Sequence, residues 1–92
     1  MAKIIIPTPL RKFTDNQSTF ETQGDTVKAA IVELTQKYQG LSRHLLDAED
    51  NIRSFIRIFI GDEDINALQK EATSVEPNSI ISIVPAIAGG IN

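Results

Sequence analysis

The fold depends on residues 24–40, which read GDTVKAAIVELTQKYQG. Apolar residues recur here at spacings of three and four, which places them on one stripe of an α-helix. Asp25 or Thr26 can accept a hydrogen bond from a free N–H of the first turn. Gly40 can end the helix in the left-handed conformation that glycine adopts readily. We therefore predict a helix over residues 27–39. Its apolar stripe comprises Val27, Ala30, Ile31, Leu34 and Tyr38.

Short segments with strand character lie on both sides of this helix. Residues 3–6 and 18–22 precede it, and residues 54–60 and 80–84 follow it. They are rich in β-branched and aromatic residues, and most of them alternate between apolar and polar positions, as half-buried strands do. The sequence therefore predicts two strands before the helix and two after it.

The connections carry proline, glycine and charged residues. Residues 7–9 (Pro-Thr-Pro) should stay extended, because a residue before proline avoids the helical region. Residues 10–16 and 61–64 are predicted to be turns or loops. Ile65 and Leu68 are expected to return to the core.

One apolar face of a sheet and one apolar stripe of a helix bury each other in a two-layer arrangement. If the first and last strands lie side by side in the centre, they must run parallel, and the helix supplies the long crossover that this needs. We predict an α+β fold of the β-grasp type, a mixed sheet of four to five strands packed on one main helix. The domain should comprise residues 1–85, with residues 86–92 as a flexible tail.

Composition narrows the function. The 92 residues carry 9 Lys+Arg against 12 Asp+Glu, a net charge of −3, which is unlike the basic surface of a nucleic-acid binder. With no cysteine, a disulfide, a thiolate metal site and a cysteine nucleophile are excluded, and His44 alone makes a poor metal site. No apolar run approaches the about 18 residues that span a bilayer. We expect a monomeric cytoplasmic protein with no membrane or nucleic-acid partner, no bound metal and no catalytic residues of its own.

An apolar surface is predicted on the outward face of the sheet. Ile56, Ile58 and Ile60 should face the helix, which leaves Phe59 exposed on the other side with Arg57. Exposed apolar side chains rimmed by charge are typical of a surface that binds other proteins. Scattered surface hydrophobic residues are the alternative. The candidate docking residues are Ile5, Arg57, Phe59, Val84, Pro85 and Ile87.

The Gly89-Gly90 pair stands two residues before Asn92. Glycine has no Cβ, so another protein's backbone can close around a diglycine segment. A C-terminal carboxylate that must enter a covered active site needs a narrow segment of this kind in front of it. A frayed end that happens to contain glycines is the alternative.

Three segments resemble the ubiquitin-like sulfur-carrier proteins, the family that includes the small subunit of molybdopterin synthase and the thiamin-pathway carrier. They are residues 24–27 (GDTV), 58–62 (IFIGD) and 78–90 (NSIISIVPAIAGG). Within that family the sequence most resembles the carriers that feed sulfur to cysteine or homocysteine synthesis.

The resemblance implies a protein substrate rather than an enzyme. An activating enzyme would use ATP to adenylate the Gly90 carboxylate beside Gly89, and sulfur would then displace AMP to leave a thiocarboxylate. It also implies that the activating enzyme grips the open sheet face, with Val84 at the position before proline. The protein itself would bind no cofactor, and the acceptor would be a synthase, for which pyridoxal phosphate is a candidate cofactor.

The sequence departs from the family pattern after the second glycine. Ile91 and Asn92 follow Gly90, so its carboxyl group is held in a peptide bond and cannot be adenylated. We therefore expect a precursor that is cut between Gly90 and Ile91, as a JAMM-type zinc metalloprotease does for some relatives with short extensions.

Two other functions stay open from the sequence. A protein modifier would use the same activation step and join Gly90 to lysines of other proteins. A stand-alone interaction domain would carry an inert tail. For a sulfur carrier, molybdopterin, thiamin or a siderophore-type thioacid are alternative destinations of the sulfur.

Overall fold

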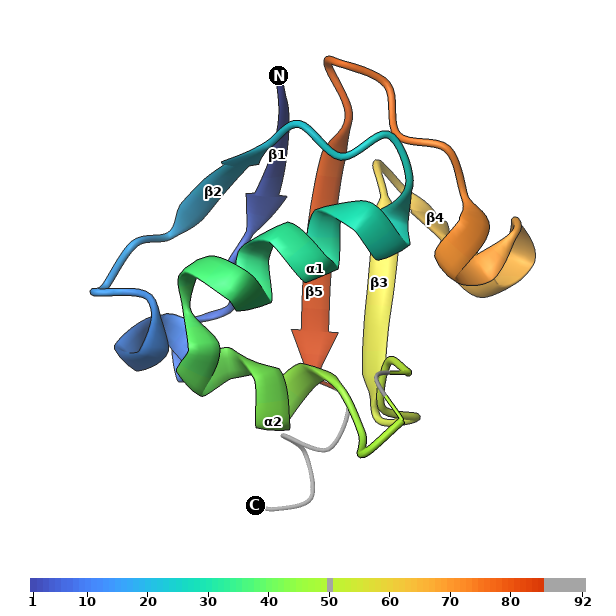
Figure 1. The fold of residues 1–92 in the computed structure, drawn as a ribbon. Coiled ribbons are helices and arrows are strands. Elements are labelled where there is room, and N and C mark those ends of the chain that lie inside the picture. The colour runs from blue at the N-terminus through green and yellow to red at the C-terminus, as the bar shows by residue number, and fades with distance from the viewer. Residues whose placement is uncertain (50, 86–92) are drawn as a thin grey trace.

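A mixed sheet of five strands, in the order β2-β1-β5-β3-β4, packs one face against a helix in this computed structural model (Figure 1). The structure describes residues 1–49 and 51–85. The predicted tail, with Ile87, Gly89, Gly90 and Ile91, lies outside these residues. The strands are β1 (Ala2–Ile5), β2 (Thr19–Thr22), β3 (Ile56–Ile60), β4 (Glu63–Asp64) and β5 (Ile80–Pro85). The α-helices are α1 (Val27–Lys37) and α2 (Ser42–Leu45).

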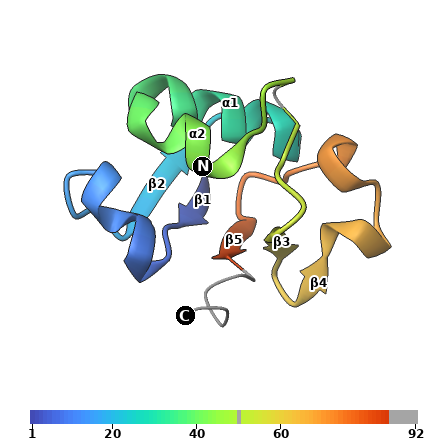
Figure 2. The same cartoon turned by 90° about the horizontal axis from the view of Figure 1, so that it is seen from below.

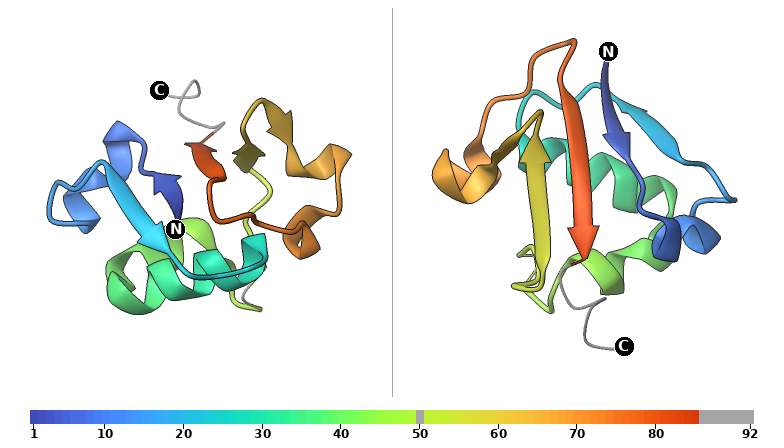
Figure 3. Two further views of the ribbon diagram at one scale, coloured as in Figure 1. Left: turned by 90° about the horizontal axis from the view of Figure 1, so that it is seen from above. Right: turned by 180° about the vertical axis from the view of Figure 1, so that it is seen from behind.

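The first and last strands pair in the centre of the sheet. β1 and β5 run parallel with Ile4 opposite Ile81, whereas β2 pairs with β1 and β3 pairs with β5 in antiparallel fashion. Figure 3 shows β5 between β1 and β3 from behind. Since parallel neighbours need a long connection, α1 forms the crossover between them. The predicted β-grasp fold is confirmed.

The core lies between the sheet and α1, as the view from below shows (Figure 2). Ile4 and Ile81 are fully buried, as are Ile31 and Leu34 of the helix stripe. Burying one such side chain contributes about 1.5–3 kcal/mol. Tyr38, the last residue of the predicted stripe, is only half-buried and packs at the edge of the core.

The start of α1 follows the prediction, but its end does not. The Thr26 side chain accepts a hydrogen bond from the backbone N–H of Ala29 at 3.1 Å. The helix ends at Lys37, and Gly40 lies in a 3₁₀ helix, η2 (Gln39–Leu41), without a left-handed φ. The chain continues from η2 directly into α2, and Leu41 is completely buried.

The segment after β1 is helical rather than extended. Residues 8–13 form the 3₁₀ helix η1 (Thr8–Phe13), so the predictions of an extended segment and a loop are wrong for these residues. Pro7 is extended and residues 14–16 form a turn, as predicted. Proline is tolerated in a first helical turn, where its missing N–H has no partner to lose. The turn buries Leu10 and is tied back by Arg11, whose Nε donates to the Ile6 carbonyl at 3.0 Å.

The turn predicted over residues 61–64 is shorter than expected. Gly61, with φ of +59°, and Asp62 form the turn, whereas Glu63 and Asp64 pair with β3 as β4. Ile65 is buried as predicted.

Leu68 does not return to the core and is 39% exposed. It terminates the single turn of η3 (Ile65–Ala67), and Val75 fills the core further along the chain. The Val75 N–H donates to the Asp25 carbonyl at 2.9 Å, which fixes this segment beside the start of α1. None of the helices among residues 1–49 and 51–85 is long and apolar enough to cross a membrane.

Gly24 lies where the chain passes close to α1. A Cβ added there would lie 2.6 Å from the backbone nitrogen of Ala30. We expect Gly24→Ala to lower the free energy of unfolding by about 1–3 kcal/mol, because backbone cannot move aside as a side chain can. Gly40→Ala is the matched control: its Cβ would lie 3.3 Å from Cδ1 of the Phe13 ring, and we expect a change within about 0.5 kcal/mol. Urea unfolding of both variants measures the difference, and equal stabilities would contradict the prediction.

Candidate functional site

The register of the strands brings four of the predicted docking residues together on the outward face. Arg57 of β3 is opposite Val84 of β5, and Phe59 is opposite Ser82. Ser82 is also opposite Ile5 of β1. Directly opposed side chains have Cβ atoms about 4.5–5.5 Å apart, so these five residues form one continuous surface, called the outward patch below.

The patch is less exposed than the sequence suggests. Val84 is 43% exposed, whereas Ile5 is half-buried and Phe59 is half-buried rather than exposed as predicted. Phe59 is flanked on β3 by Arg57 and opposed on β4 by Asp64, and an ion pair joins these two neighbours. A half-buried aromatic ring is held in place before a partner arrives, which lowers the entropy lost on binding.

The charge of Arg57 is already paired within the protein. Its Nη1 lies 3.0 Å from Oδ2 of Asp64, and the arginine side chain is 57% exposed. The other carboxylate oxygen of Asp64 accepts a hydrogen bond from the Asn66 N–H at 2.8 Å. An exposed ion pair contributes about 0–1 kcal/mol. Arg57 therefore forms part of a neutralised rim rather than a free positive charge.

Pro85 continues the sheet instead of ending it. It lies opposite Ile56 as the last residue of β5, whereas the sequence predicted that regular pairing stops there. Proline fits because this is the last residue of the strand, where loss of its N–H costs little. Pro85 thus follows Val84 of the outward patch at the end of β5, and Figure 3 shows where this strand ends.

Two residues of the site were missed by the sequence reasoning. Ser82 lies in the middle of the outward patch, and Asp64 pairs with Arg57. Alternation along β5 places Ser82 and Val84 on the same face, so the position of Ser82 could be predicted from the sequence. The position of Asp64 depends on the register of β4, which the sequence does not reveal.

The described residues contain no group of three or more His, Cys, Asp or Glu side chains that could hold a metal ion. The outward patch offers apolar contact area and a paired charge, which suit binding to another protein. The fold and this patch define a β-grasp protein with a partly apolar surface on the outward face of its sheet.

Comparison with known proteins assigns the family. The ThiS family matches residues 4–90, nearly the whole chain. The sulfur carrier protein CysO of Mycobacterium tuberculosis is 35% identical over 89 residues, which cover 95% of this chain and 96% of that protein. This protein belongs to the ThiS family of ubiquitin-like sulfur carriers, and the predicted sulfur-carrier function is thereby confirmed.

Solved structures agree with this assignment. A chain in the crystal structure of the Amycolatopsis orientalis BexX/CysO complex aligns with a TM-score of 0.88 and 29% identity, covering 98% of this chain and all of that one. The crystal structure of M. tuberculosis CysO aligns with a TM-score of 0.85 and 31% identity, covering 95% of this chain and all of that one.

The two roles of Asp64 can be separated by mutation. Arg57→Ala removes only the exposed ion pair, and we expect a loss of less than about 1 kcal/mol in the free energy of unfolding. Asp64→Ala also removes the acceptor of the Asn66 N–H, and we expect a loss of about 1–2 kcal/mol. Thermal and urea unfolding of the two variants measure these losses, and an equal loss in both would show that the second hydrogen bond contributes nothing.

Proposed function

We propose that this protein carries sulfur as a thiocarboxylate on Gly90. An activating enzyme would join the Gly90 carboxylate to AMP from ATP and release pyrophosphate. Hydrosulfide would then attack the acyl carbon, and AMP would leave with the oxygen that had joined it to the carbonyl. The observation that supports this most directly is the family match, which ends at residue 90, the second glycine of the pair.

The residues after Gly90 require a processing step. Gly90 is followed by Ile91 and Asn92, so its carboxyl group becomes available only after the Gly90–Ile91 bond is hydrolysed. We assign this cut to a JAMM-type zinc metalloprotease. Since the family match excludes these two residues, their removal would leave the whole matched region intact.

The distance from the domain to Gly90 suits delivery into a covered active site. Residues 84–90 can span at most about 25 Å when extended. The domain could therefore stay outside a partner enzyme while Gly89 and Gly90 enter it. The protein would act as a co-substrate, with ATP and any pyridoxal phosphate bound by its partners.

The outward patch is assigned to the activating enzyme. Val84 lies at the end of β5, one residue before Pro85, so an enzyme that takes up the following residues passes close to this patch. The sulfur acceptor is proposed to be a synthase that makes cysteine or homocysteine, which is consistent with the similarity to CysO.

Intact mass spectrometry tests the processing and the chemistry together. The chain ending at Gly90, incubated with the activating enzyme of the same organism, ATP and sodium sulfide, should gain about 16 Da when oxygen is exchanged for sulfur. The 92-residue chain should not gain this mass until the protease removes Ile91 and Asn92. The same mass gain by the uncut chain would refute the proposal that the chain is a precursor. Ladders of isopeptide conjugates in the native cell, without a thiocarboxylate form, would favour a protein modifier.

A matched pair of variants tests the outward patch. Val84 and Ile80 lie on the same face of β5 and are 43% and 42% exposed, but they are four residues apart, about 13 Å along the strand. We expect Val84→Asp to lower kcat/KM for adenylation at least about tenfold, because a carboxylate replaces apolar contact area at a docking surface.

Ile80→Asp, the control, should change kcat/KM less than about threefold, since it lies at the far end of the strand. Phe59→Asp should resemble Val84→Asp, with far-UV circular dichroism confirming that each variant is folded. Equal kcat/KM values for Val84→Asp, Phe59→Asp and the unmodified chain would show that the outward patch takes no part in the activation step.

A further inference from the structure

A small apolar cavity lies at the end of the domain where β5 ends. Its volume is about 250 Å³, below the about 300–1,000 Å³ that is typical of small-molecule sites, and it suits a single large side chain. It is enclosed by η1, α2, the start of β3 and the end of β5. Among the lining side chains are Pro9, Leu10, Phe13, His44, Phe55 and Pro85.

Aromatic groups shape the walls of this cavity. The rings of Phe13 and His44 pack with centroids 4.4 Å apart and an angle of 32° between their planes. Phe13 and Phe55 pack against the core but are only half-buried, so part of each ring faces the cavity. The walls are therefore largely apolar, as are the central pockets of protein interfaces.

Three positive side chains belong to this cavity or to the residues beside its lining. Lys12 places its Nζ 5.3 Å from the centre of the Phe13 ring, and the Arg53 guanidinium lies 6.0 Å from the centre of the Phe55 ring. Arg43, next to His44 on α2, is exposed. The ion pairs among residues 1–49 and 51–85 join Lys28 to Glu71 and Arg57 to Asp64, so these three cations take part in neither.

The carboxylate of Asp47, on which Arg53 acts electrostatically, already accepts hydrogen bonds from the backbone. Oδ1 of Asp47 accepts hydrogen bonds from the backbone N–H groups of Asn51 at 3.0 Å and Glu49 at 2.9 Å. These bonds, that of Asn51 first, hold the pKa of Asp47 below its ordinary value, and Arg53 adds a smaller effect.

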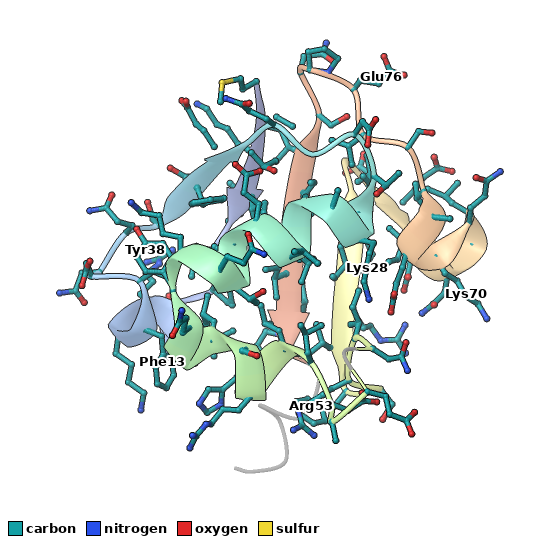
Figure 4. The ribbon with its side chains drawn as sticks, viewed as in Figure 1. Phe13, Lys28, Tyr38, Arg53, Lys70 and Glu76 are labelled. Carbon is teal, nitrogen blue, oxygen red and sulfur yellow. The ribbon has the colours of Figure 1, made fainter. Side chains whose placement is uncertain are left out.

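Charge is thus distributed unevenly in a chain whose net charge is −3. Figure 4 shows Phe13 and Arg53 at the lower end of the domain and Glu76 at the upper end. A second cavity is lined by Asp25 and Glu76 together with Met1. Lys12, Arg43 and Arg53 lie nearer the end from which residue 86 continues, where Asp47 is beside the two arginines.

We propose that this basic, aromatic collar, formed by Lys12, Phe13, Arg43, His44, Arg53, Phe55 and Pro85, binds an apolar side chain flanked by carboxylates on the activating enzyme. The inference rests on the proposed function, because an enzyme that takes up the residues after Pro85 covers the surface beside it. The apolar side chain fills the cavity, and the carboxylates meet the surrounding cations. The collar and the outward patch meet at Pro85, so one partner can contact both.

Charge reversal tests the collar without disturbing the core. Lys12→Glu and the double variant Lys12→Glu/Arg43→Glu change exposed residues, and Lys70→Glu is a control at an exposed site away from the collar (Figure 4). Binding of the chain ending at Gly90 to the activating enzyme is followed by stopped flow. We expect the double variant to associate about tenfold more slowly at low salt, with the difference closing in about 0.5 M NaCl, and Lys70→Glu to stay within about twofold.

NMR spectroscopy locates the contact. Addition of the activating enzyme to the ¹⁵N-labelled chain, tested both at full length and ending at Gly90, should perturb the amide signals of Phe13, His44 and Phe55. Perturbation confined to the outward patch overturns the proposal. If removal of residues 86–92 alone shifts the collar signals, the tail of the chain itself occupies the cavity, and shifts that depend on concentration indicate a second copy. Either result also overturns it.

The adenylation assay separates this proposal from the function on which it rests. If the unmodified chain ending at Gly90 is adenylated and the double variant associates and reacts at the same rate at every salt concentration, the collar is refuted and the carrier function stands. If the unmodified chain ending at Gly90 is not adenylated by the enzyme, the proposed function is refuted, and so is the binding of the activating enzyme to the collar.

Discussion

The parallel pairing of β1 with β5 is the interaction on which the rest of the structure depends. It joins the two ends of the described chain at the centre of the sheet and places Ile4 opposite Ile81, both completely buried. Parallel neighbours cannot be joined by a tight turn, so the intervening chain must cross the sheet, and α1 makes that crossing. The strand order therefore requires α1 to cross the sheet, and the apolar stripe of α1 is buried against it.

The central position of β5 also determines where the outward patch and the collar lie. A strand at the edge of a sheet would have a neighbour on one side only. β5 has β1 on one side and β3 on the other, and η1 and α2 lie close to its end (Figure 3). As a result the outward patch draws side chains from three strands, and the collar draws them from segments far apart in the sequence.

Periodicity predicted the parts of the structure that repeat. The stripe of α1, the inward positions Ile56 and Ile58 and the parallel central pair all follow from regular spacing and from the order of the elements. The residues of the outward patch could be predicted for the same reason, because alternation along a strand assigns every second side chain to one face.

The features that periodicity did not predict depend on contacts between segments distant in sequence. Burial of Leu10 and Leu41 favours 3₁₀ turns where proline and glycine suggested an extended segment and a helix stop. The ion pair between Arg57 and Asp64 exists only because β4 pairs in one register with β3. The collar was not predicted for the same reason: Phe13, His44 and Phe55 belong to three different segments, and no local pattern connects them.

The edge strand β4 has a consequence for how this protein can be recognised. It contains two residues, both acidic, and is followed at once by η3. So short and charged an edge gives an incoming strand little backbone with which to pair, which also protects the sheet from growing by addition of other chains. Along this edge, partners must distinguish the protein by its side chains rather than by extending its sheet.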